Sequence, residues 1–380
     1  MQNGLLVGAS ALVLVALVAC AAPSAAPSGA ARGAPATAAQ PAPAHPPALQ
    51  AVIDAARQEG VIDLVWGDTV IGGREGIDRL LEGLNRRYGL NLEARFTPGP
   101  SFPEMATRLG QEYQAGRRST SDVFIGNDIH VNALMAIGAV EAIDWAAWSL
   151  NVRDPALVAP QGVAVTFQTW VPGITYNTAR VAGDAVPRRL QDLLKPEFKG
   201  RVASTPYAGN FDRLSTPELW GKARTLDFAT RFADQLGGLV RCNEISRIAS
   251  GEFDAFAIDC NQSSALRFKA EGAPIEFTPA IDFPSVSEVY MAVPKHAAHP
   301  AAAKLWIDHA LSREGQDVLY AMNYIDSHLV PGSQTAREVD KLRAGGAQLQ
   351  VFNLARLQQS GEEAERAEVL DEIQRLFNKR

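Results

Sequence analysis

The 380-residue chain lacks several patterns that would assign it an activity at once. It has no Gly-x-Ser-x-Gly, His-Glu-x-x-His or Cys-x-x-Cys motif, which argues against an α/β-hydrolase, a zinc protease and a thioredoxin-like enzyme. It also has no run of lysines or arginines, and its net charge is -6. Because proteins that bind nucleic acid present clustered basic surfaces, no nucleic-acid partner is expected.

Cysteine is scarce as well, and the first of the three cysteines follows an apolar stretch, "GLLVGASALVLVALVAC". This stretch is shorter than the ~20 residues that a membrane-spanning helix needs, which favours an export signal. Leu17-Val18-Ala19-Cys20 resembles a bacterial lipobox. Residues 1–20 are therefore predicted to be a lipoprotein signal peptide, with Cys20 lipidated. The chain start "MQNG" lacks the usual basic residues, and a plain secretory signal is the alternative.

Residues 21–48 consist almost entirely of Ala, Pro, Ser and Gly. Such a composition cannot bury enough apolar surface to build a core, so this segment is predicted to be a disordered tether. A lipidated cysteine followed by a tether would hold the folded part near a membrane without inserting it, so the lipid anchor is the only membrane contact expected.

The rest of the chain alternates strand-like and helix-like segments. Residues 61–67 and 90–96 have the composition of strands, and residues 73–89 carry apolar side chains at helical spacing. Ser101 is placed as the N-cap of a further helix, and a later helix is predicted from Thr216, with Pro217 in its first turn. The repeated order predicts α/β units with mainly parallel sheets.

Several segments together carry a family resemblance. They include "RRLQDLLKPEFKGRVA" and, further along, "HPAAAKLWIDHALSREGQDVL". In this order they resemble the extracellular solute-binding proteins of bacterial ABC importers, family 1, and within it the ferric-iron-type branch. The resemblance runs from about residue 50 to residue 335. It implies an α/β, two-lobe periplasmic-binding-protein-like fold of class II type, with mixed, mainly parallel sheets and a hinge.

The resemblance also implies a division of the chain and a set of partners. Residues 49–167 and 286–340 are assigned to lobe 1 and residues 168–285 to lobe 2. The hinge crossings are placed near 168–177 and 276–290. The expected partners are a small-molecule solute and the permease and ATPase subunits of an importer; no cofactor and no enzymatic activity are expected. The protein is expected to be a monomer, periplasmic or on the cell surface, and lipid-anchored to the membrane.

The end of the chain, residues 341–380, is highly charged, with some apolar residues at helical spacing. It is predicted to form a C-terminal helical segment that packs on a lobe. A partner-binding arm is the alternative.

Candidate ligand-binding residues come from strand ends and helix starts, because ligands of open α/β sheets bind outside the carboxyl ends of the strands. Each has an alternative interpretation as core packing, a helix cap or a turn. The candidates are Trp66, Asp68, Arg74, Ser101, Asn127, Trp170, Tyr207, Asn210, Asn261 and Gln262.

The turn after the strand 254–259 bears on the ligand. Ferric members of the family typically place adjacent tyrosines there, whereas this chain has Cys260-Asn261-Gln262-Ser263. Amides and hydroxyls suit a small polar organic solute, and Arg74 with its glycine-rich helix start favours an anion over a cation. Ferric iron or an iron chelate is the alternative. An exported enzyme or a sensor receptor on the same fold is the alternative of another class.

Cys242 and Cys260 are predicted to form a disulfide bond, because they are the cysteines left in an oxidising compartment once Cys20 is set aside. The loop between them is short, and the bond would add roughly 3 kcal/mol to the free energy of unfolding. Mass spectrometry of non-reduced peptides should recover the cross-linked pair. Free thiols at both positions would contradict this prediction.

Overall fold

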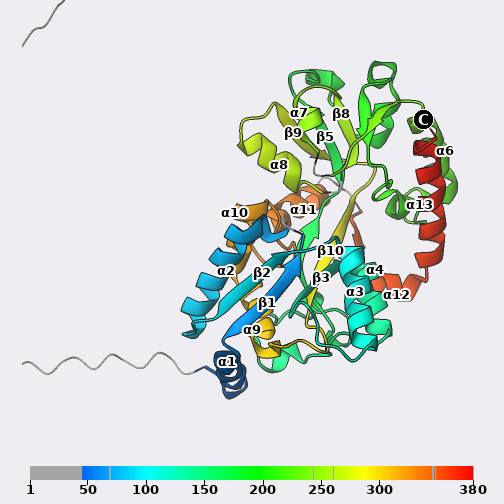
Figure 1. The fold of residues 1–380 in the computed structure, drawn as a ribbon. Coiled ribbons are helices and arrows are strands. Elements are labelled where there is room, and N and C mark those ends of the chain that lie inside the picture. Colours follow the sequence, from blue (N-terminus) through cyan, green and yellow to red (C-terminus); the bar gives the residue numbers. More distant parts are fainter. Residues whose placement is uncertain are drawn as a thin grey trace, which may run out of the picture. The chain divides into compact units, whose positions relative to one another are not determined.

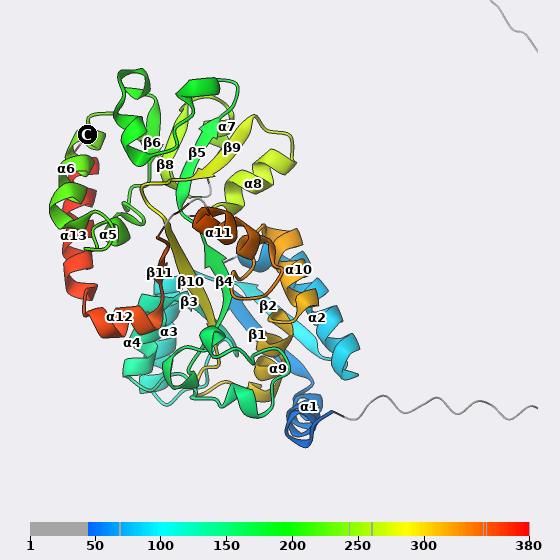
Figure 2. The ribbon, with the colours of Figure 1, turned by 180° about the vertical axis from the view of Figure 1, so that it is seen from behind.

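A computed structural model describes residues 45–379, except residues 68, 69, 243, 260, 345 and 347. The predicted signal peptide with Cys20, and the predicted tether up to residue 44, lie outside this range. Among the described residues, no helix is long and apolar enough to cross a membrane. The described strands form two groups, which we call lobe 1 and lobe 2 (Figure 1 and Figure 2).

Lobe 1 is built on the strands β1 (Val61–Trp66), β2 (Glu93–Pro98), β3 (Phe124–Asn127), β4 (Val165–Trp170) and β10 (Ser285–Ala292). Strand β1 pairs in parallel with β2, while β3 and β4 both pair antiparallel with β10 and therefore run in the same direction as each other. The amide N of Asp122 donates to the carbonyl O of Asp63, which places the start of β3 beside β1.

Lobe 1 has two apolar cores, one on each face of β10. Successive side chains of a strand point to opposite faces of the sheet, so one strand contributes to both cores. In β10, Val289 and Met291 join one core, and Tyr290 and Ala292 join the other. The first core includes side chains of α1 (Pro47–Glu59), α2 (Gly73–Tyr88), α9 (Pro300–Ala310) and α10 (Arg313–Asn323). The second includes side chains of α3 (Phe102–Gln114) and α4 (Asp128–Ala136).

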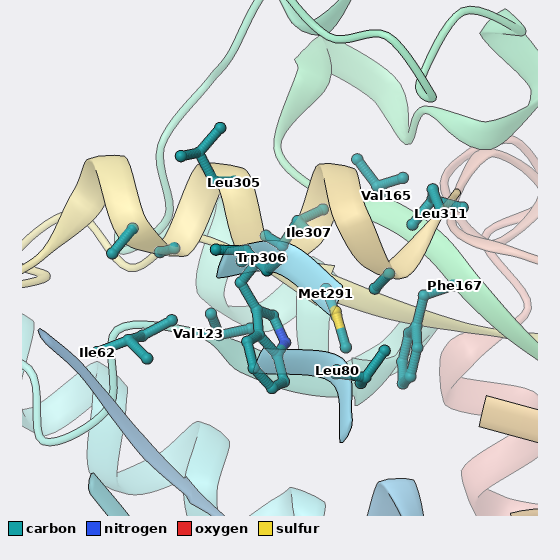
Figure 3. Close-up of a cluster of buried hydrophobic side chains, with 14 of the residues drawn as sticks. Ile62, Leu80, Val123, Val165, Phe167, Met291, Leu305, Trp306, Ile307 and Leu311 are labelled. Atoms are coloured by element: carbon teal, nitrogen blue, oxygen red, sulfur yellow. The ribbon is translucent and has the colours of Figure 1, made fainter. Parts of the chain in front are cut away.

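Trp306 is one of the largest fully buried side chains of the first core. It projects from α9 beside Met291 and Leu80 (Figure 3), and its ring lies 6.3 Å from that of Trp66 at the end of β1. Both tryptophans are 1% exposed. Helix α9 is thereby packed against the end of β1.

Lobe 2 contains a sheet in the order β7 (Leu236–Leu239), β6 (Val202–Ser204), β8 (Ala255–Asp259), β5 (Gly173–Asn177) and β9 (Ile275–Pro279). Strand β6 pairs in parallel with β7 and β8, while β5 is antiparallel to β8 and β9. The surrounding helices are α5 (Phe211–Leu214), α6 (Gly221–Ala233), α7 (Ser246–Ala249) and α8 (Ser263–Ala270).

The chain passes between the lobes at two pairs of strands. Strand β4 ends at Trp170 in lobe 1, and β5 begins at Gly173 in lobe 2. The return runs from β9, which ends at Pro279, to β10, which begins at Ser285. These positions fall within the segments proposed as hinge crossings.

The C-terminal part of the chain contacts both lobes. After α11 (Gln334–Ala344), β11 (Gln350–Phe352) pairs in parallel with β10. Helix α12 (Leu354–Ser360) then packs against α4 of lobe 1, and α13 (Glu363–Phe377) packs against α5 and α6 of lobe 2. The segment expected to lie on one lobe therefore spans the two.

Local sequence signals account for several element ends. Gly89 adopts a φ of 62° and ends α2, and Ser101 caps α3 in a capping box with Glu104. The predicted start of the later helix, at Thr216, is wrong, because α6 begins at Gly221. The hydroxyl of Thr216 caps no helix, and its backbone carbonyl instead accepts bonds in the turn before α6.

Replacing Trp306 by alanine should lower the free energy of unfolding by about 3–5 kcal/mol, because the change removes a large buried ring and leaves a cavity. Urea titration of the variant checks this value. As a control, Ile281→Ala alters a side chain that is 49% exposed and should change stability by no more than about 0.5 kcal/mol. Equal stability of the two variants would contradict this account of the core.

Candidate functional site

The carboxyl ends of strands from both lobes meet at one place. In lobe 1, β3 and β4 run in the same direction and end at Asn127 and Trp170. In lobe 2, the parallel strands β6 and β8 lead into the loops before α5 and α8. The starts of α4 and α5 face each other, since Asp128 and Arg213 lie 3.8 Å apart. We call this region the interlobe junction.

The start of α8 is fastened to the other side of the junction. The Ser263 hydroxyl donates to the carbonyl O of Asn323, at the end of α10 in lobe 1, over 2.6 Å. The neighbouring Gln262 accepts, through its Oε1, a 3.0 Å bond from the amide N of Val171, in the link between β4 and β5. Both bonds hold the turn after β8 against lobe 1 and the crossing.

Three rings from separate elements form what we call the aromatic wall: Phe102, His130 and Trp170. The rings of Phe102 and Trp170 stack with centroids 5.9 Å apart, and His130 meets Phe102 edge-on at 6.3 Å. All three side chains are partly exposed. The indole Nε1 of Trp170 has no hydrogen-bond partner among the described residues, although it is buried. A buried donor without a partner carries a desolvation cost that a ligand acceptor would remove.

His130 is held in its neutral form. Burial lowers its pKa to about 4, and the charge of Arg213 acts in the same direction, against the opposing effect of Asp128. Its ring Nδ1 accepts from the amide N of Asn127, the N-cap of α4, over 3.4 Å. A neutral imidazole leaves the aromatic wall uncharged at neutral pH.

Backbone strain gathers in the loops around the junction. A non-glycine residue with positive φ is uncommon. Such residues cluster at binding and catalytic sites, where the surrounding structure holds the backbone in a strained conformation. Ile258 is also a bulged residue, because β5 pairs with the residues on either side of it. Five of the six described non-glycine residues with positive φ are Ile71 (61°), Ala208 (49°), Asn210 (66°), Ile258 (48°) and Tyr324 (53°). The sixth, Gln161 (61°), lies in the turn before β4.

The predicted residues of lobe 1 occupy different environments. Trp66 packs in the core, with its Nε1 unpartnered among the described residues. Arg74 is exposed and pairs with Asp78 one turn along α2, at 2.9 Å. Ser101 and Asn127 act as N-caps of α3 and α4. Asp68 lies outside the described residues.

The predicted residues of lobe 2 gather near the junction. Asn210 is buried and accepts a bond from Arg213. Asn261 closes a turn by accepting from the amide N of Ser263. Tyr207 is 41% exposed, and its hydroxyl lies 2.5 Å from the Sγ of Cys242. Cys260, the predicted disulfide partner of Cys242, lies outside the described residues.

Two members of the aromatic wall and one junction residue were absent from the sequence prediction. Phe102 follows the N-cap Ser101 and His130 follows the N-cap Asn127 by three residues, so each stands in the first turn of a helix at a strand end. That position was a usable signal. Asn323 accepts from the Ser263 hydroxyl through its backbone carbonyl at 2.6 Å and through its side-chain Oδ1 at 3.2 Å. The shorter of these contacts is to the backbone, and no residue-type signal identifies it.

A possible metal cluster lies elsewhere in lobe 1. Asp63, Asp122 and His299 each bring a ligand atom within 4.8 Å of the others. The Asp122 carboxylate, however, already accepts bonds from the amide N atoms of Asp63, Ala298 and His299. Arg118 neutralises Asp63. The cluster anchors the start of α9 to β1 and β3. Its carboxylate oxygens already accept hydrogen bonds from protein groups, so they need no metal ion as a partner.

Comparison with known families finds a match to the model of bacterial extracellular solute-binding proteins over residues 121–357, more than half of the chain. Among curated proteins, a "Fe(3+)-binding periplasmic protein" of Serratia marcescens is 29% identical over 157 residues. That match covers 38% of this chain and 42% of the relative. The chain spans about half the length of the curated relatives it matches.

Two solved structures share the fold. The substrate-binding protein of an ABC transporter from Agrobacterium tumefaciens has a TM-score of 0.64 and 17% identity, covering 84% of this chain and 97% of that one. The periplasmic binding protein AfuA from Actinobacillus pleuropneumoniae, with exogenous fructose-6-phosphate bound, has a TM-score of 0.56 and 19% identity. That comparison covers 84% of this chain and 97% of AfuA.

A pH titration tests the state of His130. Its ring resonance in an NMR titration should have a midpoint near pH 4, with the variant His130→Gln used to assign the resonance. In the unfolded chain its pKa is about 6.5, so the unfolded form binds a proton first as the pH falls. As the pH falls from 6.5 to about 4, the free energy of unfolding of the wild-type protein should therefore decrease. The decrease should be smaller in His130→Gln, which lacks the titrating ring. A midpoint near 6.5 would contradict the buried, neutral ring.

Proposed function

The chain belongs to the bacterial extracellular solute-binding proteins, and from this premise we propose that it captures a small polar organic solute for an ABC importer. The solute binds at the interlobe junction and is delivered to a membrane permease driven by an ATPase subunit. The protein acts by binding and release, and no chemical step is assigned to it.

The observation that carries this proposal is the aromatic wall at the junction. Stacked rings offer an apolar face, and beside it the buried Nε1 of Trp170 has no hydrogen-bond partner among the described residues. Ligand sites of proteins combine such a surface with a few placed polar groups. The starts of α3 and α4 lie next to the wall and bring the positive end of each helix dipole there.

These groups favour an organic solute, and an anion over a cation. Helix starts and ring N–H groups donate to carboxylate, phosphate or hydroxyl oxygens. Ferric iron, in contrast, prefers anionic oxygen ligands, and the hydroxyl of Tyr207 is already engaged by Cys242. A solute of the kind bound by AfuA, a small phosphorylated organic molecule, fits this set of donors better than a bare ion does.

Iron remains the second candidate, because one curated relative is named as a ferric-binding protein. The alternative of another class, an exported enzyme or a sensor receptor, has no supporting observation in the described residues.

Closure about the two crossings would bury the solute. The link between β4 and β5 and the return from β9 to β10 are short, and rotation there changes the distance between the lobes. A solute that contacts both the aromatic wall and lobe 2 binds the closed form better, and so shifts the population toward it.

The remaining features are proposed from the sequence. Residues 1–20 act as a signal peptide, Cys20 is lipidated, and a tether follows. The predicted end of the tether at residue 48 is too late, because α1 begins at Pro47. Cys242 and Cys260 form a disulfide beside Tyr207. The protein works as a monomer, held at the membrane by its lipid and placed in the periplasm or on the cell surface.

Calorimetric titration against carboxylates, phosphorylated metabolites, polyamines and Fe³⁺ tests the proposal. We expect binding of an organic anion, and Trp170→Leu should weaken it by about tenfold or more, equivalent to about 1.4 kcal/mol. The control Trp148→Leu removes a tryptophan that packs on Trp145 in lobe 1 and should leave affinity unchanged. Tight binding of bare Fe³⁺ would overturn the assignment of an organic solute.

A further inference from the structure

The C-terminal segment, residues 350–377, forms a third link between the lobes. Strand β11 pairs with β10 beside the return crossing, and the next helix, α12, packs on α4 of lobe 1. Helix α13 then contributes Val369, Ile373 and Phe377 to the core of lobe 2. A rotation of lobe 2 must therefore carry α13 with it, while α12 stays against lobe 1.

A buried group of charges lies where this segment crosses. Asp128, at the start of α4 in lobe 1, is 1% exposed. Its carboxylate lies 3.8 Å from Arg213 of α5 and 3.8 Å from Arg366 of α13. Arg366 also donates to Asp212 over 2.7 Å, which ties it to lobe 2. Asp128 of lobe 1 thus faces two arginines of lobe 2, Arg213 and Arg366.

Phe352 of β11 holds the arginines together. Its ring is 1% exposed, and the guanidinium carbons of Arg356, Arg366 and Arg213 lie 4.5, 5.5 and 5.7 Å from its centroid. A ring face attracts cations, and more strongly where water is excluded. Arg356 adds an ion pair with Glu218 of lobe 2, at 2.7 Å. The C-terminal segment thereby supplies both the ring and two of the cations.

The Asp128 carboxylate makes no hydrogen bond with the described residues, so it is held by charge alone. Burial next to Arg213 and Arg366 is favourable only while these partners stay close, because an isolated buried charge is costly. Separation of the lobes at this point would either leave the Asp128 carboxylate buried without a charged partner or require water to enter.

We propose that the C-terminal segment is a latch that sets the equilibrium between open and closed lobes, through Asp128 of lobe 1 facing Arg213 and Arg366 of lobe 2. The latch opposes opening and confines rotation to the two strand crossings. It acts in the protein alone and does not depend on which solute is bound.

Hydrogen–deuterium exchange without any solute tests the latch. In Asp128→Asn, which keeps the size of the side chain, peptides covering residues 165–177 and 285–292 should exchange faster, on the order of tenfold. Arg366→Met should do the same at these peptides, and there the effects of the two changes should be less than additive, because both remove the contact between Asp128 and Arg366. Arg366→Met also removes the bonds to Asp212 within lobe 2 and should in addition speed exchange in α5 and α13. Small-angle scattering should show a larger radius of gyration in each.

The matched control is Lys222→Met. Lys222 pairs with Glu368 of α13 at 2.9 Å, but within lobe 2, so its loss should leave the crossings unchanged. Wild-type exchange at the crossings in both Asp128→Asn and Arg366→Met would overturn the latch. Faster exchange confined to α6 and α13 would also overturn it, because it would mean a role in lobe 2 alone. If Arg366→Met does not fold, Asp128→Asn decides the matter.

Discussion

Strand β10 is the part of the molecule on which the other parts depend. One of its edges is occupied by β4, and the other is shared end to end by β3 and β11. The start of α4, the crossing into lobe 2 and the C-terminal segment are therefore all positioned by one strand. Each of its residues is buried, so its hydrogen bonds are shielded from water. The aromatic wall and the charges around Asp128 are placed by this arrangement.

Two kinds of contact meet at the junction, and they differ in physical character. On one side, Ser263 and Gln262 make short hydrogen bonds to backbone groups of Asn323 and Val171. On the other, Asp128 is held by charges at longer range. Hydrogen bonds require close alignment, whereas attraction between charges persists over a wider range of distances. A small rotation of the lobes would thus break the first set before the second.

Much of the architecture was predictable from the sequence, because local signals agree with it. Gly89 and Ser101 mark the ends of α2 and α3 through their own backbone and side-chain preferences. The start of α6 was not, because the predicted cap at Thr216 is taken up by a turn. Of the candidate residues taken from strand ends, Asn127, Trp170 and Gln262 lie at the junction. The partnership of Phe102 with Trp170 was not predictable, because it depends on how β4 lies relative to α3.

The contribution of α13 to lobe 2 has a consequence for folding. Residues near position 370 complete a core whose other members begin near position 174, so its contacts join segments that are far apart along the chain. Contacts of this kind form late, because closing a long loop costs entropy before it gains any contact. During synthesis, the sheet of lobe 2 is present while the apolar surface meant for Val369, Ile373 and Phe377 is still bare. Until the last helix packs there, this apolar surface is open to chaperones and to aggregation.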